Sequence, residues 1–417
     1  MAIKLLIGGS PCTHWSIAQK NNRETEPVGE GWELFKNYFI AKEKFKPDFF
    51  LYENNKSASQ AIKGEIAKDL GVGTDPSVRF TYINSALVSA QNRQRFYVTN
   101  FGDIEQPEDR GLLLKDILED GVVDREKAYV LKHQAGNARD YFKKHHTQVK
   151  YERVGCMPSP DGTLKNGQGM RVYSTEGKSV TLKAESGGLG AKTGLYAIPV
   201  NTTVDGKAVT LKSQYFKNGM ANLLNDTSKG GKYTASGVAE PIGFATPIEW
   251  DENGKPTTAI SGADGKTYTV YEVKNGIITI KGKEYPIKLA DGFYIIRKLT
   301  VTECCRLQTL PDDYCKAVSD SQAYRGLGNG WTAEVIIHLL NHALKDVPRD
   351  EEIIVLSMYD GIGTGRYCLD KMGFTNIKYY AYEIDKYPIA IAMDNYPDII
   401  QCGDAFAVRE EDWEIHI

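Results

Sequence analysis

The stretch IIVLSMYDGIGTG, residues 353–365, decides the fold class of the chain. Its first six residues predict a buried strand, and the glycines that follow predict a tight turn leading into a helix. A second apolar strand, Tyr379–Glu383, ends on an acidic residue about 20 positions after the glycines. Strand, glycine-rich turn, helix and acidic strand end together indicate an open α/β sheet that binds an adenosine-bearing ligand, and Asp404 after a third strand is placed for the adenine.

The N-terminal third shows the same alternation of strands and helices. Short apolar runs predict the strands, and apolar residues at helical spacing predict the helices. The expected strands there are Lys4–Gly8, Phe49–Glu53, Phe80–Ile83 and Arg95–Phe101, and the expected helices are Trp32–Phe45 and Ser57–Leu70. After the middle of the chain, Leu299–Leu310 and Thr332–Leu344 are also expected to be helices. This pattern predicts one parallel sheet, built from both ends of the chain and covered on both faces.

The middle of the chain has a different composition. Residues 121–290 hold 22 of the 40 glycines, and Asn-Gly pairs at 166–167, 253–254 and 275–276 favour β-hairpins. The same residues carry 24 Lys+Arg against 16 Asp+Glu, a net charge of +8, whereas the remainder carries −11. An anionic polymer partner and a basic surface without a partner are both open on charge alone. The expected domains are residues 1–118, 119–292 and 293–417.

Bulk composition excludes several protein classes. No apolar run reaches the ~18–20 residues that cross a bilayer. Seven cysteines without regular spacing and without a CxxC pair argue against a disulfide framework and a structural zinc site. We therefore expect a soluble protein of a reducing cytosol, with no metal and no membrane partner.

Reactive side chains follow the predicted strands. The turn GGSPC at residues 8–12 delivers Cys12 to the carboxyl edge of the sheet, where open α/β folds place their ligands. A nucleophile and a buried structural cysteine are both open for this turn alone. Glu53 ends the next strand at the same edge. Arg93 and Arg95 are two residues apart at a later strand, so their side chains point to the same face. They could orient the acid and hold a phosphate, or they could be two solvated side chains.

As a set, these motifs resemble the DNA (cytosine-5)-methyltransferase family over about residues 1–105 and 293–405. The matching motifs are Ser-Pro-Cys at 10–12, Glu-Asn-Asn at 53–55, Gln-x-Arg-x-Arg at 91–95, the run Arg297–Pro311, Gly-Asn-Gly at 328–330 and Asp-Gly-x-Gly at 360–363. The resemblance implies an S-adenosylmethionine-dependent methyltransferase domain of Rossmann-like α/β fold, with an inserted small β-rich target-recognition domain.

The order of the motifs departs from that of most of the family. The glycine-rich loop usually comes first and the cysteine loop fourth, whereas here Ile353–Asp404 lies at the C-terminal end. We therefore expect a circular permutation, which requires that the two ends of the domain be close in space. Tyr359 stands where the family usually has Phe, Gly330 where Ser is common, and Asn55 where Val is usual.

The resemblance also implies roles for single residues. Cys12 would add to C6 of a flipped cytosine, so that C5 takes the methyl group of S-adenosylmethionine. Glu53 would hydrogen-bond the ring, and Arg93 and Arg95 would orient Glu53 and the nucleotide. The residues expected at the cofactor are Asn329, Tyr359, Asp360, Gly361, Gly363, Gly365, Glu383 and Asp404.

Double-stranded DNA is the implied partner, bound by a monomer. The residues expected to contact it are Lys20, Arg23, Gln91, Arg171 and Lys192. The first two lie in His14–Gly31, either a mobile loop that closes over DNA or an ordinary surface loop. A bacterial or phage role in DNA modification and protection from restriction follows, with the enzyme in the cytoplasm of a bacterium or an infected host.

Two other functions remain open. A tRNA cytosine methyltransferase would share the fold, but the large basic middle segment favours a reader of duplex DNA. A non-catalytic DNA-binding regulator would have lost catalytic residues, whereas Cys12, Glu53, Arg93 and Arg95 are all present.

Overall fold

Residue contacts divide the protein into two compact units. The computed structural model describes residues 2–11, 14–15, 23–117 and 299–414, together with the segments 153–156, 171–174, 179–180, 195–200, 259–261, 267–269, 271–280, 282–286 and 291–297. The first unit is Met1–Val88, Arg93–Glu108 and Gln308–Ile417, and the second is Ser89–Asn92 and Asp109–Leu307. The limits of the two units lie near the expected domain boundaries at 118/119 and 292/293 but do not coincide with them. The expected domain boundaries therefore stay predictions.

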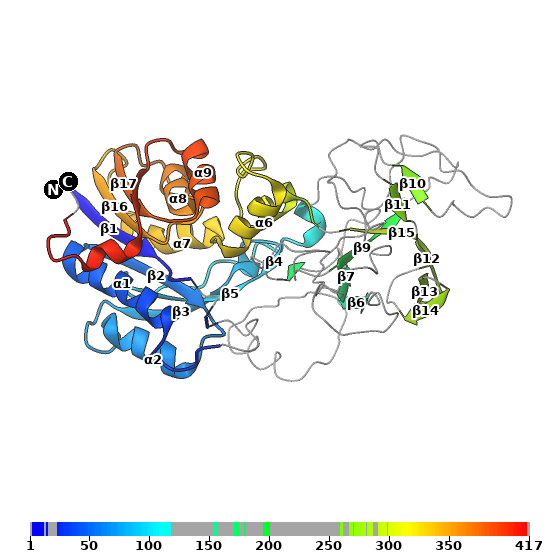
Figure 1. Ribbon diagram of the computed structural model, residues 1–417, viewed down its shortest axis with the longest axis horizontal. Helices are drawn as coiled ribbons and strands as arrows, with labels where there is room; N and C mark the ends of the chain where they lie inside the picture. The colour runs from blue at the N-terminus through cyan, green and yellow to red at the C-terminus, as the bar shows by residue number, and fades with distance from the viewer. Residues whose placement is uncertain are drawn as a thin grey trace. The chain divides into compact units, whose positions relative to one another are not determined.

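The first unit is built on one seven-stranded sheet in the order β18-β17-β16-β1-β2-β5-β3 (Figure 1). The strands are β1 (Ile3–Gly8), β2 (Phe49–Asn55), β3 (Arg79–Asn84), β5 (Gln94–Thr99), β16 (Ile353–Met358), β17 (Ile377–Tyr382) and β18 (Ile400–Gly403). From β18 to β2 neighbouring strands run parallel. Because β1 pairs with β16, from Ile3 opposite Ile353 to Gly8 opposite Met358, the prediction of one sheet from both ends of the chain is confirmed.

The prediction of a wholly parallel sheet is wrong at one end. Strand β5 runs antiparallel to both of its neighbours, β2 and β3. Between Asn84 and Gln94 the chain has only a short 3-10 turn and the two-residue strand β4 (Gln91–Asn92). A parallel return needs a crossover of a dozen or more residues, so this short link forces the antiparallel pairing.

Apolar strands occupy the centre of the sheet. All six residues of β16 are buried, and Leu5, Leu6 and Ile7 of β1 have 0% exposure. Strands that are buried on both faces read as continuous apolar runs, which is why the sequence predicts them well. At the β18 edge, by contrast, Ile400 is 46% exposed.

Helices cover both faces of this sheet (Figure 1). They are α1 (Glu30–Phe45), α2 (Gln60–Asp69), α6 (Asp320–Asn329), α7 (Ala333–Leu344), α8 (Thr364–Lys371) and α9 (Lys386–Asn395). Helix α1 buries Trp32, Phe35, Tyr38 and Ala41, residues at helical spacing, in the core that includes Tyr52. Among the described helices, none combines the length and the hydropathy that crossing a bilayer requires.

The described part of the second unit consists mainly of strands. Seven of them form a sheet in the order β14-β13-β12-β15-β9-β7-β6. Their bounds are β6 (Arg153–Cys156), β7 (Arg171–Ser174), β9 (Leu195–Val200), β12 (Tyr271–Lys274), β13 (Ile277–Ile280), β14 (Lys283–Pro286) and β15 (Gly292–Arg297). The β12–β13 hairpin turns at Asn275-Gly276, both with positive φ (54° and 70°), as its Asn-Gly pair predicts.

Helix α5 (Val301–Leu307) accounts for part of the family-matching run Arg297–Pro311. The Thr300 hydroxyl accepts a hydrogen bond from the Glu303 backbone N–H (3.1 Å), and the Glu303 carboxylate accepts one from the Thr300 N–H (2.8 Å). This is a reciprocal N-terminal capping box. The Thr-x-x-Glu spacing therefore fixes where α5 begins, at Val301, two residues inside the predicted range of Leu299–Leu310.

Candidate active site

The site begins where β1 leaves the sheet. A Cβ on Gly8 would lie 2.5 Å from the carbonyl oxygen of Met358, and a Cβ on Gly9 would lie 2.5 Å from that of Glu53. Glycine is therefore required at both positions for the chain to pass between the ends of β16 and β2. Cys12 itself lies outside the described residues, but the turn that leads to it, up to Pro11, is described.

A buried hydrogen-bond network fixes this turn to β2. The Asn54 side-chain amide donates to the Ser10 carbonyl oxygen (2.9 Å), and the Ser10 and Tyr52 hydroxyls lie 2.8 Å apart. All three side chains are nearly inaccessible, and burial raises the pKa of Tyr52. Because Ser10 is two residues from Cys12, the second residue of the Glu-Asn-Asn motif holds the approach to the cysteine, a role that the sequence did not reveal.

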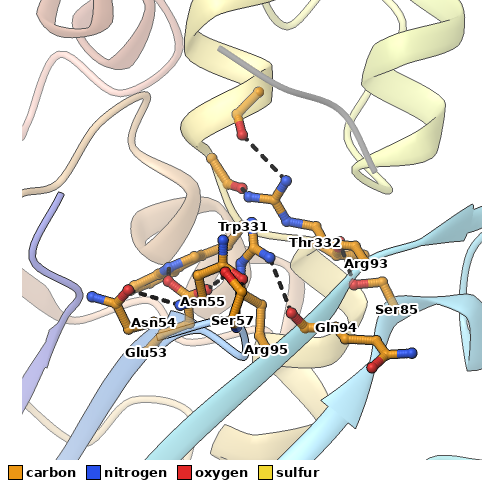
Figure 2. A network of polar contacts seen from close by, with 12 residues as sticks. Glu53, Asn54, Asn55, Ser57, Ser85, Arg93, Gln94, Arg95, Trp331 and Thr332 are labelled. Carbon is orange, nitrogen blue, oxygen red and sulfur yellow. Dashed lines mark hydrogen bonds and ion pairs between the residues drawn. The ribbon is translucent and has the colours of Figure 1, made fainter. Parts of the chain in front are cut away.

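Both oxygens of the Glu53 carboxylate have a donor (Figure 2). Arg95 Nε lies 2.8 Å from Glu53 Oε1, and the Trp331 indole N–H donates to Glu53 Oε2 at 3.1 Å. Glu53 is 8% and Arg95 7% exposed, so this ion pair is buried. The pairing of Glu53 with Arg95 matches the expectation from sequence. Trp331 was missed, although it directly follows the Gly-Asn-Gly motif.

Arg93 reaches a different element from the one expected. Its guanidinium donates to the carbonyl oxygens of Gly328 (3.2 Å) and Gly330 (2.8 Å), at the end of α6 (Figure 2). Its backbone N–H donates to the Asn84 side chain at 3.0 Å. Since Trp331 follows Gly330, Arg93 holds the turn that carries the second donor to Glu53.

The glycine-rich loop after β16 is shaped by positive φ angles and by Glu383. Tyr359, Gly361 and Gly363 have φ of 61°, 64° and 75°. The Gly361 N–H donates to Glu383 Oε2 (3.0 Å), while Glu383 Oε1 accepts from the Ile384 and Asp385 N–H groups, both at 2.8 Å. A left-handed conformation at Tyr359, which is not glycine, stores strain of the kind found at ligand sites.

Asp360 is only partly satisfied. Its Oδ1 accepts hydrogen bonds from the Ser357 and Tyr379 hydroxyls, both at 2.7 Å, whereas its buried Oδ2 has no partner among the described residues. Burial raises the pKa of Asp360 to about 6. A buried acceptor without a donor costs on the order of 1–3 kcal/mol, so a ligand that supplied a donor here would be favoured.

Three other expected cofactor residues differ in accessibility. Gly365 is buried, and a Cβ on it would clash with the side chains of Ile7 and Tyr379, so this glycine lets α8 pack closely on the sheet. Asp404 is exposed and caps the turn after β18 by accepting from the Phe406 N–H at 2.9 Å. Asn329 is exposed at the last position of α6.

Comparison with known proteins identifies the family. The model of the C-5 cytosine-specific DNA methylase family matches residues 1–345, well over half of the chain. The chain belongs to this family. It is therefore a DNA cytosine methyltransferase, and the family resemblance inferred from the motifs is confirmed.

Relatives of the methyltransferase occur in phages and bacteria. The orphan methyltransferase M.Rho11sI of Bacillus phage rho11s is 24% identical, over 83% of this chain and 86% of its own length. The orphan methyltransferase M.SPRI of Bacillus phage SPR is also 24% identical, over 80% of each chain. The type II methyltransferase M.HhaI of Haemophilus parahaemolyticus is 29% identical, over 46% of this chain and 59% of its own.

Solved structures of methyltransferases are also similar. The Entamoeba histolytica methyltransferase EhMeth has a TM-score of 0.37 and 12% identity, covering 82% of this chain and 78% of its own. The S. pombe Dnmt2 methyltransferase has a TM-score of 0.33 and 11% identity, covering 82% of this chain and 77% of its own.

Of the residues that we expected at the DNA, two have described side chains. Gln91 has no exposed surface and donates to the Leu307 carbonyl oxygen at 3.1 Å, which conflicts with a DNA contact. Arg23 donates to the carbonyl oxygens of Trp15, at 3.1 Å, and Ser57. Lys20 and Lys192 lie outside the described residues, and only the backbone of Arg171 is described, in β7.

The base of the segment His14–Gly31 is closed by Glu24. The Trp15 indole N–H donates to Glu24 Oε2 (3.1 Å), the Gly31 N–H donates to the same oxygen (3.2 Å), and the Glu24 N–H donates to the His14 carbonyl oxygen (2.9 Å). Trp15 is fully buried. These contacts tie together the two ends of the segment expected to close over DNA.

We predict that Asp360→Asn changes how the stability of the methyltransferase depends on pH. Because the folded-state pKa of Asp360 is raised from 3.8 to about 6, the folded protein binds this proton more tightly than the unfolded chain. The stability that Asp360 contributes is thus complete below about pH 4, declines as the pH rises to about 6, and is level above. The Asn side chain keeps an acceptor oxygen but cannot ionise, so its contribution to stability should not change over this pH range.

The measurement is the melting temperature of both proteins from pH 4 to pH 7. The wild type should lose on the order of 2 kcal/mol of unfolding free energy relative to Asp360→Asn across this range, as the rise in the pKa of Asp360 requires. The exposed Asp346→Asn is the control and should track the wild type. Parallel curves of melting temperature against pH for the wild type and Asp360→Asn would contradict the raised pKa of Asp360.

Proposed function

We propose that this DNA cytosine methyltransferase uses Cys12 as its nucleophile and S-adenosylmethionine as its methyl donor, at a specific sequence in duplex DNA. The observation that carries the proposal is the buried Glu53 carboxylate, held by Arg95 and Trp331, whose strand also anchors the turn to Cys12. A carboxylate with fixed geometry beside a cysteine turn is the arrangement that base activation requires. The phage relatives support a role in DNA modification.

The proposed reaction starts at the cysteine. The Cys12 thiolate forms a bond to C6 of a cytosine flipped out of the duplex, and the electron pair of the C5–C6 double bond becomes available at C5. Glu53 accepts a hydrogen bond from the exocyclic amine and, once N3 takes up a proton, from N3–H, which stabilises the charge that develops on the ring. S-adenosylmethionine, when bound, supplies the methyl group. Loss of the C5 proton to a base and departure of the Cys12 sulfur from C6 then restore the double bond.

The polar network around Glu53 supports this role. Its ion pair with Arg95 and its hydrogen bond from Trp331 leave the carboxylate little freedom to rotate, so it can meet a base without reorganisation. Arg93, by holding Gly328 and Gly330, acts through Trp331 as a positioning residue.

The residues around the glycine-rich loop fit S-adenosylmethionine. Glu383 is held in place by three backbone N–H groups and would bind the ribose hydroxyls, while exposed Asp404 would bind the adenine amine. The Oδ2 atom of Asp360, which has no partner in the described part of the chain, suits the cationic part of the molecule. A Cβ on Gly361 would meet nothing within 4 Å, and Ile384, 72% exposed, offers an apolar surface next to Glu383.

We also propose that the domain is circularly permuted and that the basic, β-rich middle segment is an inserted target-recognition domain. The family match ends at residue 345, yet β16, β17 and β18 beyond it complete the same sheet as β1. The last turn of α1 is close to both chain ends, because Lys4 Nζ reaches the Phe45 carbonyl oxygen (3.5 Å) and Lys44 Nζ that of Glu410 (2.6 Å). Such proximity is what a permutation needs.

Cys12→Ser should abolish methyl transfer, by at least about 1,000-fold, because a serine hydroxyl is a far weaker nucleophile than a thiolate at neutral pH. Duplex DNA and S-adenosylmethionine should still bind. The measurement is transfer of tritiated methyl groups to duplex DNA, with tRNA as the competing acceptor and Cys315→Ala as the control. Full activity in Cys12→Ser would refute the mechanism, and preferential labelling of tRNA would refute the DNA substrate.

Glu383→Ala should weaken binding of S-adenosylmethionine by roughly 10- to 100-fold, since it removes a charge-assisted acceptor for ribose hydroxyls. Isothermal titration calorimetry measures the dissociation constant directly. Glu352→Ala, which removes a surface ion pair with Lys378, is the matched control and should bind normally. An unchanged dissociation constant in Glu383→Ala would overturn the cofactor assignment.

A relinked chain tests the permutation. Joining the two ends with a Gly/Ser linker of about ten residues and opening the chain between Lys345 and Asp346, both exposed, restores the usual family order. We expect this protein to fold and to methylate DNA within about tenfold of the original rate, because the sheet contacts survive. The control opens the same closed chain at Gly64, inside α2. Equal loss of folding in both would contradict the proposal.

A further inference from the structure

An ion pair joins helix α6 to the segment that precedes helix α9. Arg325 Nη1 of α6 lies 3.1 Å from Asp385 Oδ2, and the two side chains are 50% and 23% exposed. The other oxygen of this carboxylate, Asp385 Oδ1, caps α9 by accepting from the Tyr387 N–H at 3.1 Å. Asp385 therefore makes a local contact and a long-range contact with two different oxygens.

The segment that contains Asp385 also fixes the Glu383 carboxylate. The backbone N–H groups of Ile384 and Asp385 both donate to Glu383 Oε1 at 2.8 Å. Glu383 Oε2 accepts from the Gly361 N–H of the glycine-rich loop at 3.0 Å. Because hydrogen bonds weaken when their geometry changes, a shift of Asp385 would disturb the carboxylate proposed to bind the ribose hydroxyls.

Helix α6 packs closely on the glycine-rich loop. A Cβ on Gly326 would lie 2.8 Å from Ile362 Cγ2, so the helix backbone meets the loop directly. Asn329, expected at the cofactor, follows Arg325 by four residues, so the two exposed side chains share one face of α6. The Arg325–Asp385 ion pair thus connects the helix that carries Asn329 to the segment that carries Glu383.

We propose that Arg325 is a positioning residue for S-adenosylmethionine: through Asp385 it holds α6 and the segment Glu383–Asp385 at the spacing that the cofactor requires. The inference rests on the proposed function in taking S-adenosylmethionine as the cofactor and Glu383 as its ribose ligand. Without the ion pair, the cofactor must order these two elements when it binds, and that cost weakens its binding. Once the cofactor is bound, the spacing is restored, so the rate of methyl transfer at saturation should be nearly unchanged.

Calorimetric titration of S-adenosylmethionine into a graded series of variants tests this role. Arg325→Gln should weaken binding about 3- to 5-fold, as suits a partly exposed ion pair, and Arg325→Lys, which keeps the charge, should stay within about twofold of the wild type. Arg325→Glu, which repels Asp385, should weaken binding more than Arg325→Gln does. Asp385→Asn keeps the helix cap but loses the charge, so it should match Arg325→Gln.

A double-mutant cycle separates the ion pair from the charge of Arg325 alone. In the Asp385→Asn background, Arg325→Gln should cause no further loss of cofactor affinity, because its partner is already neutral. A full additional loss in this background would overturn the proposal.

Steady-state kinetics supply a readout that general damage to the fold would not reproduce. In Arg325→Gln, KM for S-adenosylmethionine should rise about 3- to 5-fold, while kcat at saturating cofactor should stay within about twofold of the wild type. Lys316→Gln is the matched control, because it removes the ion pair of Lys316 with Asp394, near the other end of α9 (3.7 Å). Its KM and kcat should equal those of the wild type.

Unchanged cofactor affinity in Arg325→Gln would overturn the proposal, as would an equal loss in Lys316→Gln or a fall in kcat alone. If Asp385→Asn fails to fold, Arg325→Gln compared with Lys316→Gln decides. Weaker binding in Glu383→Ala but not in Arg325→Gln would refute the positioning role and leave the proposed function standing. Unchanged binding in Glu383→Ala would refute the cofactor assignment itself.

Discussion

The close approach at Gly8 and Gly9 is the constraint on which the rest of the site depends. Each glycine passes within 2.5 Å, measured from an added Cβ, of a carbonyl oxygen on a neighbouring strand, Met358 on one side and Glu53 on the other. The end of β1 therefore packs tightly between the loop that begins at Tyr359 and the strand that carries Glu53. Any side chain at these positions would push the two halves apart. Under the proposed mechanism, this close packing at the end of β1 sets the distance between the methyl donor and the base, because the two bind on opposite sides of β1.

Two carboxylates at this edge are in contrasting environments. Glu53 has a donor at each oxygen, and a buried ion pair of this kind fixes a geometry more than it stabilises a fold. Asp360 has one oxygen satisfied by two hydroxyls and the other buried without a described partner, and its pKa is raised to about 6. Both Glu53 oxygens are satisfied within the described part of the protein, whereas Asp360 Oδ2 has no donor among the described residues and is open to a ligand donor. Under the proposed mechanism, this difference separates Glu53, which is preorganised for chemistry, from Asp360, which takes part in binding.

The sequence predicted the central strands and the glycine-rich loop because their signals are local: continuous apolar runs, glycines, and the Thr300–Glu303 spacing. It could not predict partners that the chain brings together from a distance. Trp331 is 278 residues from Glu53 in sequence, and the indole that completes this carboxylate has no signature beyond following Gly-Asn-Gly. Arg93 and Gln91 were placed by their motif, but a motif does not say which carbonyl an amide or a guanidinium will meet. The strand β5 was expected, but its antiparallel direction was missed, because a short link rather than composition determines that direction.

Helix α1 shows how the proposed permutation can be tolerated. Its buried Asn37 donates to the Tyr359 hydroxyl at 3.2 Å and accepts from Arg409 Nε at 2.5 Å, and the Tyr359 hydroxyl donates to the Leu34 carbonyl oxygen at 2.7 Å. The Asn37 amide thus joins the glycine-rich loop after β16, helix α1 and the C-terminal tail. A covalent link between β18 and β1 would hold these elements together by chain connectivity. Without that link, the side-chain contacts of α1 supply the same restraint, so the order of the strands in the sheet need not follow the order of the chain.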